Sequence, residues 1–391
     1  MSVTADVDAN LIAAARRIAA EVAAPQALEV DREARFPVET LAALRDEGAL
    51  AALVPRNLGG PEASLEAVAA ACFELGRGCA AAGMVFAMHQ IQVASLVDHR
   101  GDSSWFEDYL REVATDQPLI ASITSEVGTG GDTGKSVAAV SEPDGEGRVR
   151  FEKQAPTVSY GDHADAYLTT ARRAPDAEPG DQVAVLTRRE QMEMEPQGTW
   201  DPLGMRGTCS PGFVAKATFD QAQILPIPFA TISAETMTPV SHILWSHVWL
   251  GIATDAFDRA RAFVKASARR TPGEQPPTAV RLSALLGELT LLRGEVGMAL
   301  REYSDLRRDD RARLTEMATI LRFNNLKIAA SEQAPRVCQE AMGVCGIVGY
   351  KNDTPFSVGR HLRDSMSARL MVANDRIHAT DASLLLVAKE V

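Results

Sequence analysis

The stretch with the most chemical content runs from Ala121 to Asp132 and reads ASITSEVGTGGD. A strand-like run passes Ser125 and ends among three glycines, which are Gly128, Gly130 and Gly131. Because glycine has no Cβ, a turn built from it lets bare backbone N–H groups approach an anion. A second hydroxyl, Ser159, follows in another strand-like segment, VSYG. A strand, a hydroxyl and a glycine cradle together suit a dinucleotide that lies along a small β-domain.

Two standard phosphate-binding motifs fit this stretch only in part. In the P-loop pattern, G-x-x-x-x-G-K-[ST], Gly134 and the Lys-Ser after it fit, but the first glycine falls on Thr129. In the Rossmann pattern, Gly128 and Gly130 fit, and Thr133 stands where the third glycine belongs. Both patterns need a helix to follow, whereas the turn-rich SEPDGEG follows here. By itself the stretch is therefore also compatible with a surface hairpin loop.

The letters TSEVGTGGD resemble the flavin loop of the acyl-CoA dehydrogenase family, which is usually Thr-Glu-Pro followed by Ala-Gly-Ser-Asp. Other pieces similar to that family come in the same order, at 36–60, 158–173, 203–220 and 339–364. Together they cover nearly the whole chain. The resemblance implies an oxidoreductase that binds FAD and acts on an acyl thioester carried by CoA or a carrier protein.

The resemblance also implies roles for residues around the flavin, whose ring needs hydrogen-bond partners at its pyrimidine edge and at N5. Ser125 and Ser159 fall where the family places its two flavin-facing hydroxyls, and Gly130 and Gly131 fall at the pyrophosphate. The alternative for each serine is that it satisfies the edge of a strand.

Three further residues match positions that reach the FAD of a neighbouring subunit. Arg269 and Thr271 match the family's Arg-x-Thr, although Pro272 replaces the usual Phe, and an exposed basic helix end is the alternative. Gly343 matches part of a C-terminal glycine loop, but Glu340 replaces the usual Gln, and an acid beside an adenosine diphosphate is unfavourable. These matches imply a homotetramer, because the family completes its FAD site across subunits.

The catalytic base that the family uses is missing. α,β-Dehydrogenation of an acyl thioester removes an α-proton while hydride leaves Cβ, and family members use a glutamate as the base. In one lineage the glutamate follows an Arg-Asp pair, here Arg363-Asp364, and the matching position is Val372. In the other lineage the matching position is Ser241. Asp375, three residues beyond Val372, is the candidate base, and its alternative role is a helix cap.

A histidine offers a different chemistry. His89 lies on the helix that floors the family's substrate cavity, where monooxygenases on this fold, such as dibenzothiophene monooxygenase, also use a histidine. The alternative is a core histidine satisfied by its neighbours. Thr157 replaces the tryptophan that dehydrogenases often place beside the ring, which weakens the case for coupling to an electron-transfer flavoprotein.

Three functions follow from these residues. The first is FAD-dependent dehydrogenation of an acyl thioester with a non-standard base and an electron-transfer flavoprotein as partner. The second is a flavin-dependent monooxygenase that takes reduced flavin, FAD or FMN, from a partner reductase and activates O₂. The missing glutamate favours the second, because oxygenation needs no α-proton base, whereas the flavin loop favours the first. A non-catalytic scaffold is the third.

Composition excludes several other classes. The net charge of −12 argues against nucleic acid, which needs a basic face, and gives no attraction to anionic membranes. The five cysteines are scattered without metal-ligand spacing, so we expect reduced thiols, no metal site and a cytoplasmic protein. The acidic N-terminus lacks the apolar core of a signal peptide, and we expect no uncharged apolar run that approaches membrane-spanning length.

The elements that must position these residues fall into three domains of an α+β fold. Apolar residues recur with the helical period through 1–120, which predicts an N-terminal helical domain. At 121–233 the period changes to alternation, as in Phe213–Phe219, which predicts a small antiparallel β-domain containing the flavin loop. The helical period returns at 234–391, which predicts a C-terminal helical bundle with a glycine-rich loop after Met342 and a last helix from about 355. We expect Arg363 and Asp364 to form a hydrogen-bonded pair that orients this last helix.

Overall fold

A computed structural model of the chain describes residues 3–270 and 272–388. Helices build its N-terminal part: α1 (Val3–Ile18), α2 (Ala24–Glu33), α3 (Val38–Asp46), α4 (Leu65–Gly78), α5 (Ala80–His99) and α6 (Ser104–Asp116). The hydroxyls of Ser64 and Ser103 accept backbone N–H groups at the starts of α4 and α6. These caps satisfy donors that no helical partner reaches, so they define where the two helices begin.

Helix α5 lies at the centre of the N-terminal part. By length and composition it is long and apolar enough to cross a membrane, so the expectation that no uncharged apolar run approaches that length is wrong. However, 89% of its most apolar window is buried inside the protein, which makes it a core helix. His89, Gln90 and Gln92 give this helix buried polar side chains.

The middle part holds two three-stranded sheets among the described residues, with strand orders β1-β3-β4 and β2-β6-β5. The strands are β1 (Ile120–Ile123), β2 (Arg148–Ala155), β3 (Ala166–Arg172), β4 (Gln182–Arg188), β5 (Met192–Gln197) and β6 (Gly212–Asp220). The predicted antiparallel pairing holds for β2 with β6, β5 with β6 and β3 with β4. The exception is β1, which runs parallel to β3 with Ile120 opposite Ala166. A parallel pair requires a long crossover, and the chain from the glycine loop through β2 supplies it.

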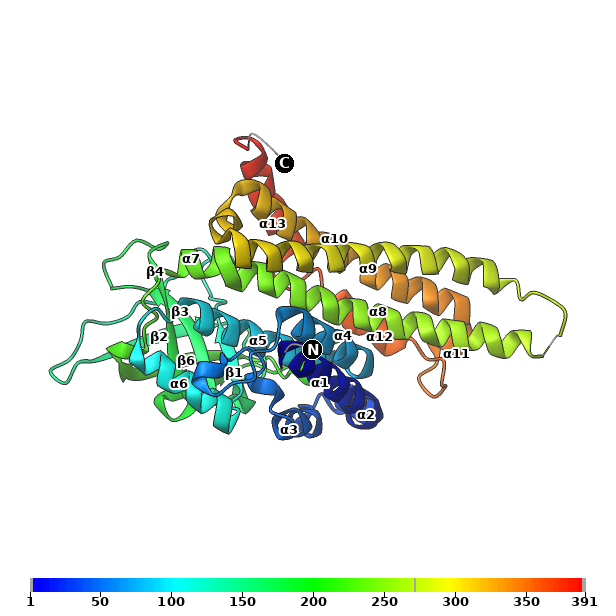
Figure 1. The fold of residues 1–391 in the computed structure, drawn as a ribbon, viewed down its shortest axis with the longest axis horizontal. Helices are drawn as coiled ribbons and strands as arrows, with labels where there is room; N and C mark the ends of the chain where they lie inside the picture. Colours follow the sequence, from blue (N-terminus) through cyan, green and yellow to red (C-terminus); the bar gives the residue numbers. More distant parts are fainter. Residues whose placement is uncertain (1–2, 271, 389–391) are drawn as a thin grey trace.

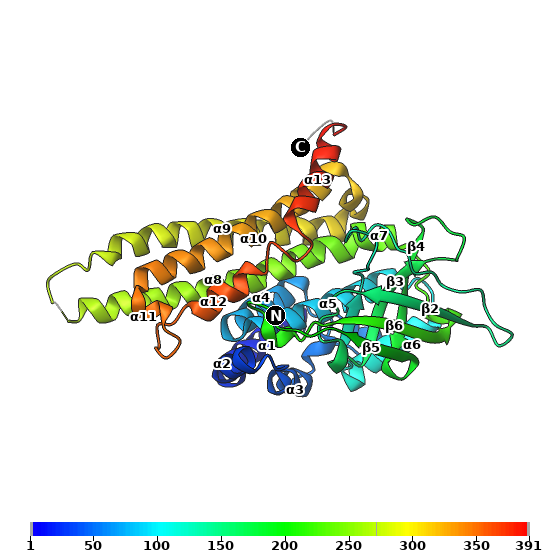
Figure 2. The same ribbon diagram turned by 180° about the vertical axis from the view of Figure 1, so that it is seen from behind.

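The C-terminal part consists of α7 (Phe229–Ile232), α8 (Thr238–Ala268), α9 (Thr278–Asp309), α10 (Met317–Cys345), α11 (Ile347–Tyr350), α12 (Gly359–Met366) and α13 (Asn374–Leu385). Figures 1 and 2 show α8, α9 and α10 side by side as a long bundle, with the sheets near one end and the α8–α9 connection at the other. At the contact of this bundle with α4, a Cβ on Gly251 would lie 2.3 Å from the carbonyl oxygen of Phe73. Glycine therefore lets the backbones of α4 and α8 touch.

Two expectations about the C-terminal part are wrong. The glycine-rich loop expected after Met342 is the last turn of α10, which continues because Val344 and Cys345 are buried. The single last helix is two helices, α12 and α13, separated by a turn in which Val372 has a φ of +45°. A left-handed backbone at a β-branched residue cannot continue a helix, so the chain changes direction there.

Candidate functional site

The glycine loop leaves the end of β1 and turns through left-handed backbone. Gly128, Gly130 and Gly131 have φ angles of +94°, +61° and +76°. A residue with a Cβ would be strained at each of these positions, so the loop needs its glycines for conformation. The side chain of Thr129 shapes the turn by accepting the backbone N–H of Gly131 at 3.2 Å.

A buried ion pair holds both ends of this loop. The Glu126 carboxylate accepts the hydroxyl of Ser136 and the backbone N–H of Ala138, each at 2.6 Å. It also lies 3.3 Å from the Nζ of Lys153, which is fully buried on β2. Burial lowers the pKa of Lys153 to about 8, against the effect of Glu126. No sequence motif marks either residue as part of a site. The one signal in the sequence is a lysine at an inward position of the alternating pattern of β2.

The two expected flavin-facing hydroxyls lie on neighbouring segments. Ser125 donates to the carbonyl oxygen of Thr157 at 2.9 Å, two residues before Ser159. Ser159 accepts a hydrogen bond from Ser210 at 3.0 Å, and Ser210 lies 2.9 Å from the hydroxyl of Thr208. The fold therefore brings the end of β1 beside the β2–β3 connection. It also adds Ser210, a residue that no motif in the sequence marks.

An arginine from the far C-terminus lies against the glycine loop. A Cβ on Gly131 would lie 1.9 Å from Nη1 of Arg376, on the first turn of α13, so the guanidinium occupies the space that glycine leaves. No carboxylate or carbonyl group of the described residues hydrogen-bonds or pairs with this half-buried guanidinium. A free cation therefore lies beside a turn of left-handed glycines, an arrangement that suits an anion.

The turn before α13 is held by a buried lysine. The Nζ of Lys327 donates to the carbonyl oxygen of Val372 at 3.0 Å and to Oδ1 of Asn374 at 2.6 Å. Burial lowers the pKa of Lys327 to about 8. The side chains at the two positions matched to the family's base are those of Val372, which is exposed, and Ser241, which is buried on α8. Asp375 is exposed in the first turn of α13, where a carboxylate also favours the helix dipole.

His89 is fully buried and both of its ring nitrogens have backbone partners. Nε2 lies 2.8 Å from the carbonyl oxygen of Leu50, and Nδ1 accepts the N–H of Ile120 at 3.0 Å. Nε2 therefore carries the hydrogen. Burial also lowers the pKa of the ring to about 4. Neither ring nitrogen of His89 is free for the catalytic role expected of it. The geometry favours the alternative of a core histidine, which here joins α5 to β1.

The residues expected to reach a neighbouring subunit lie far from the loop of their own chain. Arg269 is exposed at the end of α8, at the bundle end opposite the sheets, and Thr271 lies outside the described residues (Figure 1). Gly343 is helical, and Arg281 donates to its carbonyl oxygen at 3.1 Å. The same arginine pairs with Glu340 at 3.2 Å, so the unfavourable acid has a counter-ion.

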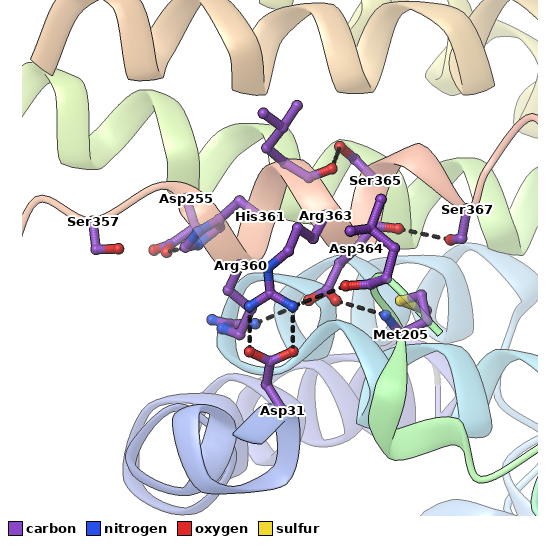
Figure 3. A network of polar contacts seen from close by, with 12 residues as sticks. Asp31, Met205, Asp255, Ser357, Arg360, His361, Arg363, Asp364, Ser365 and Ser367 are labelled. Carbon is purple, nitrogen blue, oxygen red and sulfur yellow. Dashed lines mark hydrogen bonds and ion pairs between the residues drawn. The ribbon is translucent and has the colours of Figure 1, made fainter. Parts of the chain in front are cut away.

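Arg363 and Asp364 are adjacent in the chain but bind different partners. Arg363 forms a bidentate ion pair with Asp31 of α2, whereas Asp364 accepts the backbone N–H of Met205 at 2.7 Å (Figure 3). The expected hydrogen bond between the two is therefore wrong. Adjacent residues on α12 point to different partners, and they join this helix to α2 and to the turn before β6.

Comparison with known proteins decides the family. Residues 6–117 match the family described as acyl-CoA dehydrogenase, N-terminal domain, and residues 234–381 match acyl-CoA dehydrogenase, C-terminal domain. The chain belongs to the acyl-CoA dehydrogenase family. This membership confirms the predicted α+β fold and the predicted class of flavin-dependent oxidoreductase.

Relatives of this family member carry different activities in their names. Amino sugar nitrososynthase DnmZ from Streptomyces peucetius is 27% identical over 347 residues, covering 84% of this chain and 81% of DnmZ. Probable acyl-CoA dehydrogenase FadE25 from Mycobacterium tuberculosis is 25% identical over 379 residues, covering 96% of this chain and 94% of FadE25.

Solved structures share the fold over nearly their whole length. KijD3 in complex with dTDP superposes with a TM-score of 0.83 at 23% identity, covering 99% of this chain and 98% of KijD3. FMN-bound TdsC from Paenibacillus sp. A11-2 has a TM-score of 0.81 at 18% identity, covering 97% of both chains. Butyryl-CoA dehydrogenase from Megasphaera elsdenii also has a TM-score of 0.81 at 18% identity, covering 97% of this chain and 98% of that one.

Proposed function

We propose that this chain is a flavin-dependent monooxygenase that oxygenates a nitrogen or sulfur atom of a small molecule, using reduced flavin and O₂. The observation that carries the proposal is the absence of a carboxylate at Val372 and Ser241, the two positions matched to the family's base. Removal of an α-proton requires such a base, whereas oxygen transfer to a heteroatom does not. DnmZ is named a nitrososynthase, and TdsC is named a dibenzothiophene monooxygenase, which supports this direction.

The residues present fit a flavin phosphate. Left-handed glycines expose backbone N–H groups, and the free guanidinium of Arg376 lies directly on Gly131. We assign the phosphate to Gly130, Gly131 and Arg376, and the ring to the hydroxyls of Ser125 and Ser159. When bound, FAD or FMN supplies the electrons that activate oxygen. The chain's own part is to orient the ring through the two serines and to neutralise the phosphate.

The remaining cofactor contacts belong to an assembly. We assign Arg269 and Gly343, together with Thr271 by its match to the family's Arg-x-Thr, to the flavin nucleotide of a neighbouring copy in a cytoplasmic homotetramer. The distance of Arg269 from the glycine loop of its own chain supports this assignment, because only a second copy brings the two together (Figure 2). A flavin reductase supplies the reduced flavin.

A second candidate function is dehydrogenation of an acyl thioester, with an electron-transfer flavoprotein as acceptor. It is favoured by Asp375, an exposed carboxylate three residues beyond Val372. The likeness to FadE25 over 96% of the chain points the same way. In this function Asp375 is the base.

An anaerobic titration separates the two. The flavin-loaded protein is mixed with a panel of acyl-CoAs while the absorbance of the oxidised flavin is followed. We expect no bleaching with any acyl-CoA. With reduced flavin, ¹⁸O₂ and a panel of amines and thiophenes, we expect one labelled oxygen atom in the product by mass spectrometry.

Asp375→Asn is the matched variant for this experiment. Oxygenation should be unchanged in the variant, because Asp375 has no role in the proposed reaction. Bleaching by an acyl-CoA in the wild type that Asp375→Asn abolishes would establish the dehydrogenase instead.

A further inference from the structure

A cavity of about 500 Å³ lies away from the glycine loop, between α2, α8, α12 and the loop at 352–357. Five arginines line it: Arg32, Arg206, Arg259, Arg360 and Arg363. Asp31 is the acidic residue of the lining. The chain as a whole has 52 acidic and 40 basic residues, so the charge balance is inverted here. An inverted local charge in a cavity of this size favours an anionic ligand.

Some of these arginines hold the walls. They are Arg206, Arg259 and Arg363, and their acidic partners are Asp201, Asp255 and Asp31 respectively. Arg259 also donates to the carbonyl oxygen of Ser357 at 3.2 Å, which fixes the loop at 352–357. Their charges are matched within the protein, so they shape the cavity and leave recognition to other residues.

Arg360 is different, because its guanidinium is almost enclosed and poorly satisfied. Its side chain is 13% exposed, and its one ion pair among the described residues is a 3.4 Å contact with Asp364. The N–H groups of Arg360 that have no protein partner are accessible to solvent, and they face the cavity that this residue lines. An anion in the cavity would replace water as the acceptor of these N–H groups and add a charge-assisted hydrogen bond in a partly enclosed place, where it is stronger than in bulk water.

Two further side chains of the lining have unused polar groups. Arg32, exposed on α2, has no ion-pair partner among the described residues. His361 hydrogen-bonds to Asp255 through Nε2 at 2.7 Å, while its buried Nδ1 has no partner in the part of the chain that the structure describes (Figure 3). The apolar part of the lining also comes from α2: Ala24, Pro25, Ala27 and Leu28.

We propose that this cavity is a second ligand site, which binds a small organic phosphate with its phosphate group on Arg360 and Arg32. The apolar wall of α2 contacts the organic part. Because the walls come from the N-terminal domain and from α8 and α12, the ligand bridges the two helical parts of the molecule. The site is separate from the glycine loop, so it does not compete with the flavin.

The test is calorimetric titration of FMN-saturated protein at constant ionic strength, with inorganic phosphate and ADP as probes. Saturation with FMN fills the phosphate position at Gly131. We expect both probes to bind without releasing FMN, and ADP to bind more tightly because it also covers the apolar wall. Arg360→Gln should raise the dissociation constant about tenfold, the usual scale for a lost charge-assisted pair.

Two further variants serve as controls for this experiment. Arg32→Gln removes an arginine that has no protein partner, so it should weaken both probes without lowering stability. Arg111→Gln, an exposed arginine on α6 that pairs with Asp108, should leave binding unchanged. Equal binding in Arg360→Gln and Arg111→Gln, or no heat with either probe, would overturn the proposal. Equal affinity for phosphate and ADP would show that the apolar wall of α2 does not contact the organic part of the ligand.

Discussion

Among single residues, Arg376 makes the contact with the clearest chemical consequence. Its guanidinium lies in the space beside Gly131 where any other residue would place a Cβ. Because the guanidinium is half-buried, a phosphate bound to it would be partly shielded from water, which strengthens the attraction.

We expect Arg376→Gln to weaken flavin binding about tenfold, since one charge-assisted contact to the phosphate is lost. Quenching of flavin fluorescence measures the affinity. Arg336→Gln, which removes an exposed arginine of α10, is the control and should bind flavin normally. Riboflavin, which has no phosphate, should bind Arg376→Gln and the wild type equally. A matching loss for riboflavin would show that Arg376 acts on the fold and not on the phosphate.

Among the elements, α5, α8 and α12 carry imidazoles in their buried faces. Burial lowers the pKa values of His89, His242, His247 and His361 to about 4, from an ordinary value of 6.5. Between pH 6.5 and 4 the unfolded chain therefore binds protons that the folded chain excludes. The free energy of unfolding falls as the pH drops through this window, and the contribution is fully present above it.

We expect the midpoint of urea unfolding to decrease steadily from pH 6.5 to pH 4. His247→Gln should make this decrease shallower, because the variant takes up about one proton fewer on unfolding and the slope of the unfolding free energy with pH is proportional to that number. His378→Gln is the control, because this histidine is exposed. If His247→Gln follows the slope of His378→Gln, the ring of His247 is not held neutral by burial.

For the molecule as a whole, the long bundle of α8, α9 and α10 leaves apolar side chains in solvent. Val280, Leu286, Leu291 and Met298 of α9 are all largely exposed, with Leu291 at 72%. Exposed apolar residues along one helix are typical of an interface between chains. They lie on the helical bundle that carries Arg269. Association of two copies through α9 would therefore also place Arg269 near the partner chain, as the proposed flavin contact requires.

If the proposed homotetramer forms through α9, Leu291→Glu should reduce it to smaller species, because a carboxylate cannot be buried in an apolar interface without a partner. Light scattering after size-exclusion chromatography measures the mass. Val38→Glu, a similar change on an exposed residue of α3, should keep the tetramer. A wild type that is already monomeric would contradict the predicted assembly.

The sequence by itself determined the order of the domains and the place of the glycine loop. Helical and strand periods are local, and left-handed turns need glycine, so both can be recognised without any knowledge of packing. It also showed that no carboxylate stands at Val372 or Ser241.

Only the tertiary structure decided which side chains meet. Arg376 reaches Gly131, and Lys153 reaches Glu126. The two ring nitrogens of His89 hydrogen-bond to the backbone of Leu50 and Ile120. Each of these contacts joins segments that are separate in the chain, and each depends on the way that helices and sheets pack against one another. Burial decided the chemistry as well, because an imidazole or an ammonium group keeps its ordinary pKa in water and loses it inside the protein.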